Sequence, residues 1–176
     1  FNTEREEGFA VFVVDNTNRT EARYWIDDFL RVRQRQDNYH NTHNTLAMCK
    51  KYVTKHLSKE FEVSKADQAE LLNETMKYFQ EQESFSMDDF SEKVIRQPEV
   101  VESFTRFRQE YEQDRDIRIE DEFAISESAV KKQARSYKSV IKLDRNFHIY
   151  VHGNRNLLEQ GEDEKGKFYK VYYEEE

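Results

Sequence analysis

Seven basic side chains between residues 126 and 155 are the residues of this sequence best suited to bind a ligand. At the 100° turn per residue of an α-helix, those nearest the start of the run project from one side of a predicted helix over 126–137. Such a stripe can follow successive phosphate groups, and the ring of Tyr150 offers a surface on which a base can stack. The alternative is a solvated helix face that offsets acidic helices elsewhere. The seven residues are Lys131, Lys132, Arg135, Lys138, Lys142, Arg145 and Arg155.

A second basic patch precedes this stripe in the chain. Arg31, Arg33 and Arg35 stand at alternate positions, so on an extended backbone all three project from one side. Guanidinium groups bind phosphate in a bidentate manner, which makes the row suitable for a polyanion. Lys51 and Lys55 add two cations one helical turn apart. The alternative, equally open, is that these cations pair with carboxylates of the same chain.

The sequence offers no constellation that indicates catalysis or a bound metal. His40 and His43 have helical spacing, but no third ligand, HExxH motif or cysteine pair accompanies them. The paired carboxylates at 27–28 and 88–89 are adjacent, so on regular structure their side chains diverge. Glycine-rich phosphate loops and a serine nucleophile elbow are absent. We therefore predict a protein that is not an enzyme and that has no metal or other cofactor.

The charge distribution divides the chain into alternating segments. The net charge is −8, from 28 Lys and Arg against 36 Asp and Glu. Residues 19–59 and 126–155 each carry +5, whereas residues 60–125 carry −11. The acidic block would repel a polyanion unless it faces away from the basic segments. Alternatively, the acidic block recruits a basic protein partner.

The elements that must position these residues form an α+β arrangement with a helical middle and a small antiparallel C-terminal β-meander. The run 9–14 reads as a buried strand, and apolar residues at helical spacing predict a helix over 42–57. After residue 137 the period becomes alternating, which predicts strands. The expected strands cover 140–143, 147–151, 157–159 and 168–173. We describe the chain as a single domain with a strand and basic helix over 1–60, an acidic helical block over 61–125, and a basic helix and sheet over 126–176.

The sequence of the acidic block contains signals for where its helices begin and end. Ser64 with Asp67, and Ser86 with Asp89, each match a capping box, and Pro98 suits the first turn of a helix that ends near residue 115. Further expectations concern which side chains face inward. Those facing inward are expected to be Ala69, Leu72, Met76 and Phe79, then Val101, Phe104, Phe107 and Tyr111, then Val130, Ala134 and Tyr137. His148, Tyr150 and His152 are expected to share one face of a half-buried strand, opposite Phe147, Ile149 and Val151.

Composition excludes several classes of protein. The 24 aromatic residues with only four Gly and one Pro indicate a folded domain, because large rings bury much area per residue. A single cysteine, Cys49, excludes an internal disulfide framework and favours a reducing compartment. The longest apolar run, 9–14, is far below the ~20 residues of a membrane span, so we expect no membrane association.

The order of these features resembles the bacterial 37-kDa nucleoid-associated protein family, whose members are NdpA/YejK-like. The landmarks are Ala22 to Trp25 with Phe29 and Leu30, Ser64 to Asp67 before Tyr78 and Phe79, Phe85 to Ser91, Phe104 to Tyr111, Phe123 before Ser126, Lys131 to Lys138, Ile141 to Asp144, and a hairpin ending near Val171. The resemblance covers most of the chain, which begins at Phe1, and we expect it to correspond to about the C-terminal half of a full-length member.

The resemblance implies a cytoplasmic protein of the nucleoid that binds DNA, double- or single-stranded, with little sequence preference. We also expect a nucleoid protein partner or self-association. The resemblance identifies no base-reading residues, so the choice of the stripe over 131–155 rests on charge alone. Two alternatives stay open: an adaptor that recruits a partner through its acidic helical face, and a nuclease-like enzyme, which would need a metal cluster that the spacing does not supply.

Overall fold

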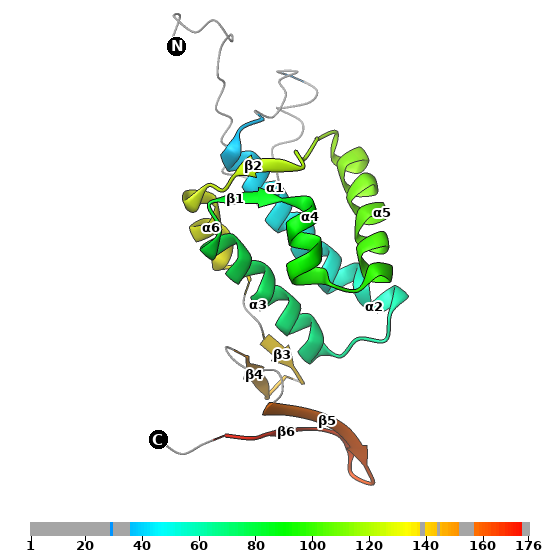
Figure 1. The fold of residues 1–176 in the computed structure, drawn as a ribbon. Helices are drawn as coiled ribbons and strands as arrows, with labels where there is room; N and C mark the ends of the chain where they lie inside the picture. Colours follow the sequence, from blue (N-terminus) through cyan, green and yellow to red (C-terminus); the bar gives the residue numbers. More distant parts are fainter. Residues whose placement is uncertain (1–28, 30–35, 138–139, 144, 152–156, 174–176) are drawn as a thin grey trace, which may run out of the picture. The chain divides into compact units, whose positions relative to one another are not determined.

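The computed structural model describes residues 29, 36–137, 140–143, 145–151 and 157–173 (Figure 1). Residues 1–35 and 36–176 form separate compact units, and the contacts given below all lie within the second. The predicted strand over 9–14 falls outside the described residues. Within the second unit, helices and short antiparallel strand pairs confirm the α+β class.

The described chain begins with a series of helical segments. Helix α1 (Asn38–Lys51) continues through a π-helix (Tyr52–His56) into α2 (Leu57–Glu60), and α3 (Lys65–Glu81) follows. Strand β1 (Ser84–Ser86) leads into α4 (Met87–Phe90), a second π-helix (Ser91–Ile95) and α5 (Pro98–Arg115). Strand β2 (Glu122–Ala124) then precedes α6 (Glu127–Ala134). The helix expected over 42–57 is therefore confirmed, but it begins four residues earlier and contains a π-helical turn.

Capping explains why α3 and α5 begin where they do. The Ser64 hydroxyl accepts a hydrogen bond from the Asp67 amide (3.0 Å), and the Asp67 carboxylate accepts one from the Ser64 amide (2.9 Å). This reciprocal pair confirms the predicted capping box. Pro98 is the first residue of α5, which ends at Arg115 as expected. At the other end, Asp116 adopts a left-handed conformation (φ 49°) that stops the helix.

The capping box predicted at Ser86 is wrong. Ser86 does stand at the N-cap of α4, but its side chain makes no capping hydrogen bond. The Asp89 carboxylate instead accepts a hydrogen bond from the Tyr78 hydroxyl (2.8 Å) and pairs with Lys93 (2.9 Å). Lys93, followed by Tyr78, lowers the pKa of Asp89, while burial and then Asp89 raise the pKa of Tyr78 to about 12. Asp89 therefore ties α4 to α3.

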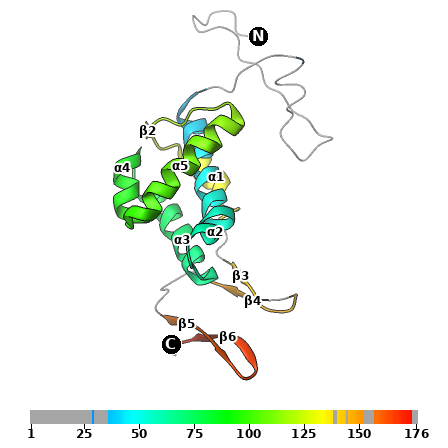
Figure 2. The same cartoon turned by 90° about the vertical axis from the view of Figure 1, so that its right-hand side faces the viewer.

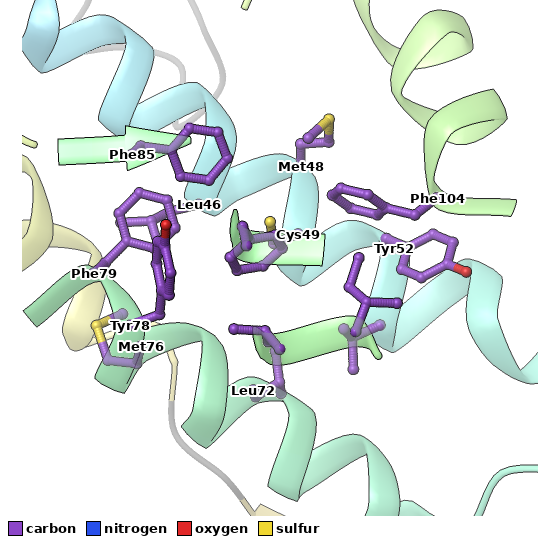
Figure 3. Close-up of a cluster of buried hydrophobic side chains, with 14 of the residues drawn as sticks. Leu46, Met48, Cys49, Tyr52, Leu72, Met76, Tyr78, Phe79, Phe85 and Phe104 are labelled. Carbon is purple, nitrogen blue, oxygen red and sulfur yellow. The ribbon is translucent and has the colours of Figure 1, made fainter. Parts of the chain in front are cut away.

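The main core is a cluster of aromatic and aliphatic side chains from α1, α3, β1, α4 and α5 (Figure 3). The Phe85 ring stacks on Phe79 at 5.3 Å and on Phe123, its register partner across β1 and β2, at 4.9 Å. The Tyr52 ring meets Phe104 edge-on at 5.1 Å. These large rings fill the core of a chain that is only 36% apolar.

The inward faces of the two long helices follow the sequence expectation closely. On α3, the four predicted side chains are all buried. On α5, Phe104, Phe107 and Tyr111 are buried, whereas Val101 is half-buried and Val100 is buried beside it. The period of 3.6 residues is therefore a sound guide to these two helices.

The C-terminal strands form two separate hairpins. Strand β3 (Val140–Lys142) pairs with β4 (His148–Tyr150), and β5 (Leu158–Asp163) pairs with β6 (Gly166–Val171), both antiparallel. The pairing is antiparallel as expected, but the four described strands do not join into one continuous meander. Both hairpins contribute to a second, smaller core with α3, which contains Ala66, Ala69, Ile141, Val151 and Leu158. The Asn73 amide also donates to the Val151 carbonyl (3.2 Å).

The predicted alternation along 147–151 is partly confirmed. Val151 is buried and Ile149 half-buried, while His148 and Tyr150 are exposed. Phe147, expected on the inner side, is instead 64% exposed because it lies in the turn before β4 begins. His152 lies outside the described residues.

Candidate nucleic-acid interface

Helix α6 is held lengthwise against α1. Val130 is buried in the main core, and the Ser126 amide donates a hydrogen bond to Thr42 Oγ1 (2.9 Å). At the other end, the buried Tyr137 hydroxyl donates to the Leu46 carbonyl. The helix ends at Ala134, three residues earlier than expected, and a turn carries the chain to Tyr137. These contacts bring together the described parts of the two basic segments.

The basic side chains of α6 are exposed, as predicted. Lys131, Lys132 and Arg135 all face solvent while Val130 and Tyr137 are buried. Lys131 pairs with Glu127 one turn earlier (3.0 Å), and both side chains are more than three-quarters exposed. An exposed pair of this kind contributes little free energy and leaves the ammonium group accessible to a phosphate. Within the described chain, no carboxylate forms an ion pair with Lys132 or Arg135.

Tyr39 lies beside the α6 cations. Lys132 Nζ is 3.3 Å from the Tyr39 hydroxyl oxygen and 6.0 Å from the centre of the ring. The Tyr39 ring stacks on His43 at 6.3 Å, and the His43 imidazole is 2.9 Å from the Gln133 amide nitrogen. A half-buried aromatic ring next to the exposed Lys132 is suited to contact a nucleotide.

Sequence reasoning missed Tyr39 because it expected the helix to begin at residue 42. The cap at Asp37, whose carboxylate accepts a hydrogen bond from the His40 amide (3.0 Å), is the signal that locates the true start. With that start, Tyr39 lies on the first turn of α1, where it reaches α6.

The remaining residues of the predicted stripe divide into three groups. Arg145 is exposed in the turn between β3 and β4. Lys142 belongs to β3, where it pairs in register with His148. Lys138 and Arg155 lie outside the described residues. Only the α6 cations and Arg145 are therefore placed as exposed side chains.

The second basic patch is described only in its helical part, because Arg31, Arg33 and Arg35 lie outside the described residues. Lys51 and Lys55 are both exposed. Lys51 Nζ lies 5.3 Å from the centre of the Tyr111 ring, which is a cation–π contact with α5. Of the described cations, those of α6 thus lie near the start and middle of α1, whereas Lys51 and Lys55 lie near and beyond its end.

The acidic helix α5 lies on the other side of α1 from α6. Residues 98–122, which contain α5, have nine carboxylates and four cations. Figure 1 shows α5 and α6 on opposite sides of α1, and in Figure 2, turned by 90°, α5 lies in front of α1. Within the block, Arg106 pairs with Glu60 (3.2 Å) and Glu102 (3.1 Å), and Arg108 with Glu112 (3.2 Å) and Asp121 (2.5 Å). The block's carboxylates are therefore partly neutralised by its own arginines.

Groups that could do chemistry are engaged in structural contacts. The Tyr52 hydroxyl donates a hydrogen bond to the buried Ser103 (3.0 Å). The His56 imidazole is 2.9 Å from a Glu60 carboxylate oxygen. Neither contact pairs a serine with a histidine. Burial raises the pKa of the Cys49 thiol well above its ordinary range, which keeps it protonated and unreactive. Among the described residues, no cluster of three His, Cys, Asp or Glu side chains could hold a metal ion.

Comparison with known proteins identifies the family. A family model described as NA37, nucleoid-associated protein YejK, matches residues 1–172. The chain belongs to this family. The match confirms the resemblance inferred from the sequence landmarks and extends over nearly the whole chain. No individual curated protein and no solved structure was found to match.

Membership of the nucleoid-associated YejK family gives the chain a nucleoid-associated role. Within the described residues, none of the helices is long and apolar enough to cross a membrane. The exposed basic helix α6, with Tyr39 beside it, is the surface that such a role draws attention to.

Proposed function

We propose that the chain is a non-enzymatic DNA-binding protein of the nucleoid, with little sequence specificity, that contacts phosphates through its basic stripe. The observation that carries the proposal is the placement of charge around α1. Lys132 and Arg135 are exposed on α6 without carboxylate partners in the described chain, and the acidic helix α5 lies on the far side of α1. A phosphate backbone can therefore approach α6 without meeting the carboxylates of α5 first.

In this proposal the stripe positions the protein along the backbone and reads no bases. Lys131, Lys132 and Arg135 make the central contacts, and Arg145 extends them toward the β3–β4 turn. Lys138, Lys142 and Arg155 continue the stripe in the sequence, and the patch of Arg31, Arg33, Arg35, Lys51 and Lys55 is a secondary site. Contacts to phosphate carry no sequence information, so affinity should vary little among duplexes.

Salt dependence provides the decisive measurement. Each phosphate contact releases condensed counterions, so the logarithm of the association constant falls linearly with the logarithm of salt concentration. The slope is about −0.9 for each phosphate neutralised on duplex DNA, and about −0.7 on single strands. Comparing the association constants for duplex and single-stranded DNA at the same salt concentration shows which form the protein prefers.

The test compares two triple variants that change the net charge equally. The first, K131A/K132A/R135A, removes the α6 cations. The second, K59A/K77A/R118A, removes three exposed cations that lie outside the proposed stripe. We expect the first to weaken binding to all duplexes alike and to reduce the salt slope by roughly one unit for each lost contact. The matched control is expected to retain the wild-type slope.

Two further outcomes decide between the hypotheses. If both variants bind DNA as the wild type does, the α6 stripe is not the site and the patch at Arg31, Arg33 and Arg35 becomes the better candidate. If the wild type itself does not bind DNA at low salt, DNA binding by this chain is refuted. The adaptor function is then favoured by the exposed carboxylates of α5 and the segment after it, including Glu110, Asp114 and Glu120.

A further inference from the structure

The β3–β4 hairpin is anchored to the helices at one end only. Ile141 is fully buried in the second core beside α3, and Ile149, its register partner, packs against the same core. The Val151 carbonyl, just after β4, accepts a hydrogen bond from the Asn73 amide of α3 (3.2 Å). In Figure 2 the other end of the two strands points away from the helices. The hairpin thus has a fixed base and a projecting end.

The projecting end carries exposed apolar side chains beside polar ones. Leu143 and Phe147 are 43% and 64% exposed. The Leu143 amide donates a hydrogen bond to the Phe147 carbonyl (3.0 Å), which closes the turn and holds the two residues opposite each other. Arg145 and Asn146 lie between them in the chain, and both are exposed. We call these four residues the β3–β4 tip.

The tip has the side chains of a DNA wedge. Proteins that bend DNA through the minor groove insert one or two apolar side chains, such as Phe or Leu, between neighbouring base pairs. They contact the edges of the bases in that groove with Arg, Lys, Asn or Gln. Because the minor groove presents nearly the same hydrogen-bonding pattern for A·T and T·A pairs, these contacts give little sequence specificity.

Size and charge favour DNA over a protein partner for this tip. Two exposed apolar side chains are too few for the core of a stable protein interface, which involves about 20–30 residues on each side. In the sequence, residues 128–158 contain seven Lys and Arg and a single carboxylate, Asp144, which lies outside the described residues. The segment that carries the tip therefore attracts a polyanion.

The tip is also near enough in the chain to act on DNA that α6 holds. Arg145 follows Arg135 by ten residues, which span at most about 36 Å when fully extended. One turn of duplex DNA is about 34–36 Å long. The greatest separation of the two sites is therefore about one turn, so a single short duplex can contact both.

We propose that the β3–β4 tip is a wedge that inserts Phe147, with Leu143 beside it, between neighbouring base pairs from the minor groove and thereby bends the duplex. The inference rests on the proposed function, because the α6 cations supply the phosphate contacts that hold the DNA. Insertion breaks the stacking of one base step, so flexible pyrimidine–purine steps are the expected positions.

Ring closure of a short duplex by DNA ligase tests the proposal, because it detects a bend at any position along the DNA. A duplex of about 100 base pairs is shorter than the persistence length of about 150 base pairs, so it closes slowly unless it is bent. At equal occupancy of the DNA, we expect the wild type to accelerate closure on the order of tenfold. Phe147→Ala should lose most of this acceleration and Leu143→Ala part of it. The matched controls Tyr173→Ala and Leu157→Ala, at exposed positions outside the tip, should act as the wild type does.

Phe147→Trp gives a direct measurement of insertion. This variant keeps a large ring, so it should accelerate ring closure nearly as the wild type does. Duplex DNA should quench the fluorescence of the introduced indole, because the indole stacks between bases. The wild type, whose one tryptophan is Trp25, is the reference. The same titration with vesicles of phosphatidylserine and phosphatidylcholine tests another anionic surface.

The results separate bending from binding. Loss of acceleration in Phe147→Ala and its retention in Phe147→Trp, at equal occupancy, would support the wedge. A wild type that binds DNA with the expected salt dependence but does not accelerate closure would overturn the wedge and leave the proposed function intact. Equal acceleration by Phe147→Ala and the wild type would overturn the wedge as well, and so would quenching by vesicles but not by DNA. A wild type that does not bind DNA at low salt would overturn both proposals.

Discussion

The hydroxyl of Tyr137 is a sensitive point for the docking of α6, and Tyr137→Phe should change stability in a way that depends on pH. The phenol is buried and donates to the Leu46 carbonyl, at the junction between α6 and α1. Burial raises its pKa well above the ordinary value of 10, so in the folded protein it keeps its proton into the alkaline range. The phenylalanine variant removes both the hydrogen bond and the titrating group while keeping the ring.

The expected magnitudes differ at the two ends of the pH range. At neutral pH the variant loses one hydrogen bond, which costs about 0.5–1.5 kcal/mol of the free energy of unfolding. Above pH 10 the unfolded wild type releases the Tyr137 proton and the folded form does not. The stability of the wild type then falls by up to about 1.4 kcal/mol per pH unit from this one group. Because the variant has no phenol to ionise, the two curves should converge and meet between about pH 10 and pH 11, depending on the gap at neutral pH.

The sign follows from linkage. A group whose folded pKa is raised contributes its full stabilisation below the unfolded pKa and loses it as pH rises toward the folded pKa. Urea unfolding followed by circular dichroism at neutral pH and at several values above pH 10 gives the two curves. Tyr173→Phe is the control, because its ring is 76% exposed and stays in water in both states. If the gap between wild type and Tyr137→Phe stays constant with pH, the buried phenol does not have the role assigned to it.

Two further changes test the core and the caps. Phe85→Ala should lower the free energy of unfolding by about 3–5 kcal/mol, since Phe85 is 1% exposed and packs against four rings. In the same urea titration the control Phe147→Ala, at an exposed position, should lower it by less than about 0.5 kcal/mol. Ser64→Ala should cost about 0.5–2 kcal/mol by removing the cap of α3; equal stability of Ser64→Ala and wild type would show that the capping box has no energetic role.

Local signals in the sequence were enough to predict the long helices and their buried faces. The capping box at Ser64 and the proline at position 98 begin α3 and α5, and the period of 3.6 residues selects Leu72, Phe79 and Phe107 for the core. These features depend on residues within one or two turns of each other. A single sequence therefore contains the information needed to predict them.

Features that depend on distant parts of the chain could not be predicted in the same way. Strands β1 and β2 contain three residues each, so neither shows an alternating pattern long enough to be recognised, and they pair across the 35 residues 87–121, which are mostly helical. A serine three residues before an acidic residue predicts a capping box at Ser86, yet the Asp89 carboxylate accepts its hydrogen bond from the distant Tyr78 hydroxyl instead. The division of the C-terminal strands into two hairpins likewise depends on how each packs against α3.

For the candidate interface, the exposure of the α6 cations was predictable from the segregation of polar and apolar residues within one helix. Tyr39 was not, because its approach to Lys132 depends on the packing of α6 against α1, more than ninety residues apart in the chain. Whether the acidic block faces the stripe is a question of tertiary arrangement for the same reason. The net charge of −8, taken alone, would have argued against a polyanion partner.

The arrangement of the helices explains why that net charge does not decide the matter. Helix α1 separates α6 from α5, and a helix with its side chains is about 10–12 Å across. At physiological ionic strength the Debye length is about 8 Å, so repulsion between the carboxylates of α5 and a phosphate on α6 is largely screened. The contacts that we propose between phosphate and Lys132 or Arg135 would be direct, and they would be screened much less. A lower salt concentration increases the Debye length, and with it both the attraction by the α6 cations and the repulsion by the α5 carboxylates. The carboxylates should therefore reduce the increase in DNA affinity that occurs at very low salt. A plot of affinity against salt that flattens there would therefore be the signature of two opposed faces on one small domain.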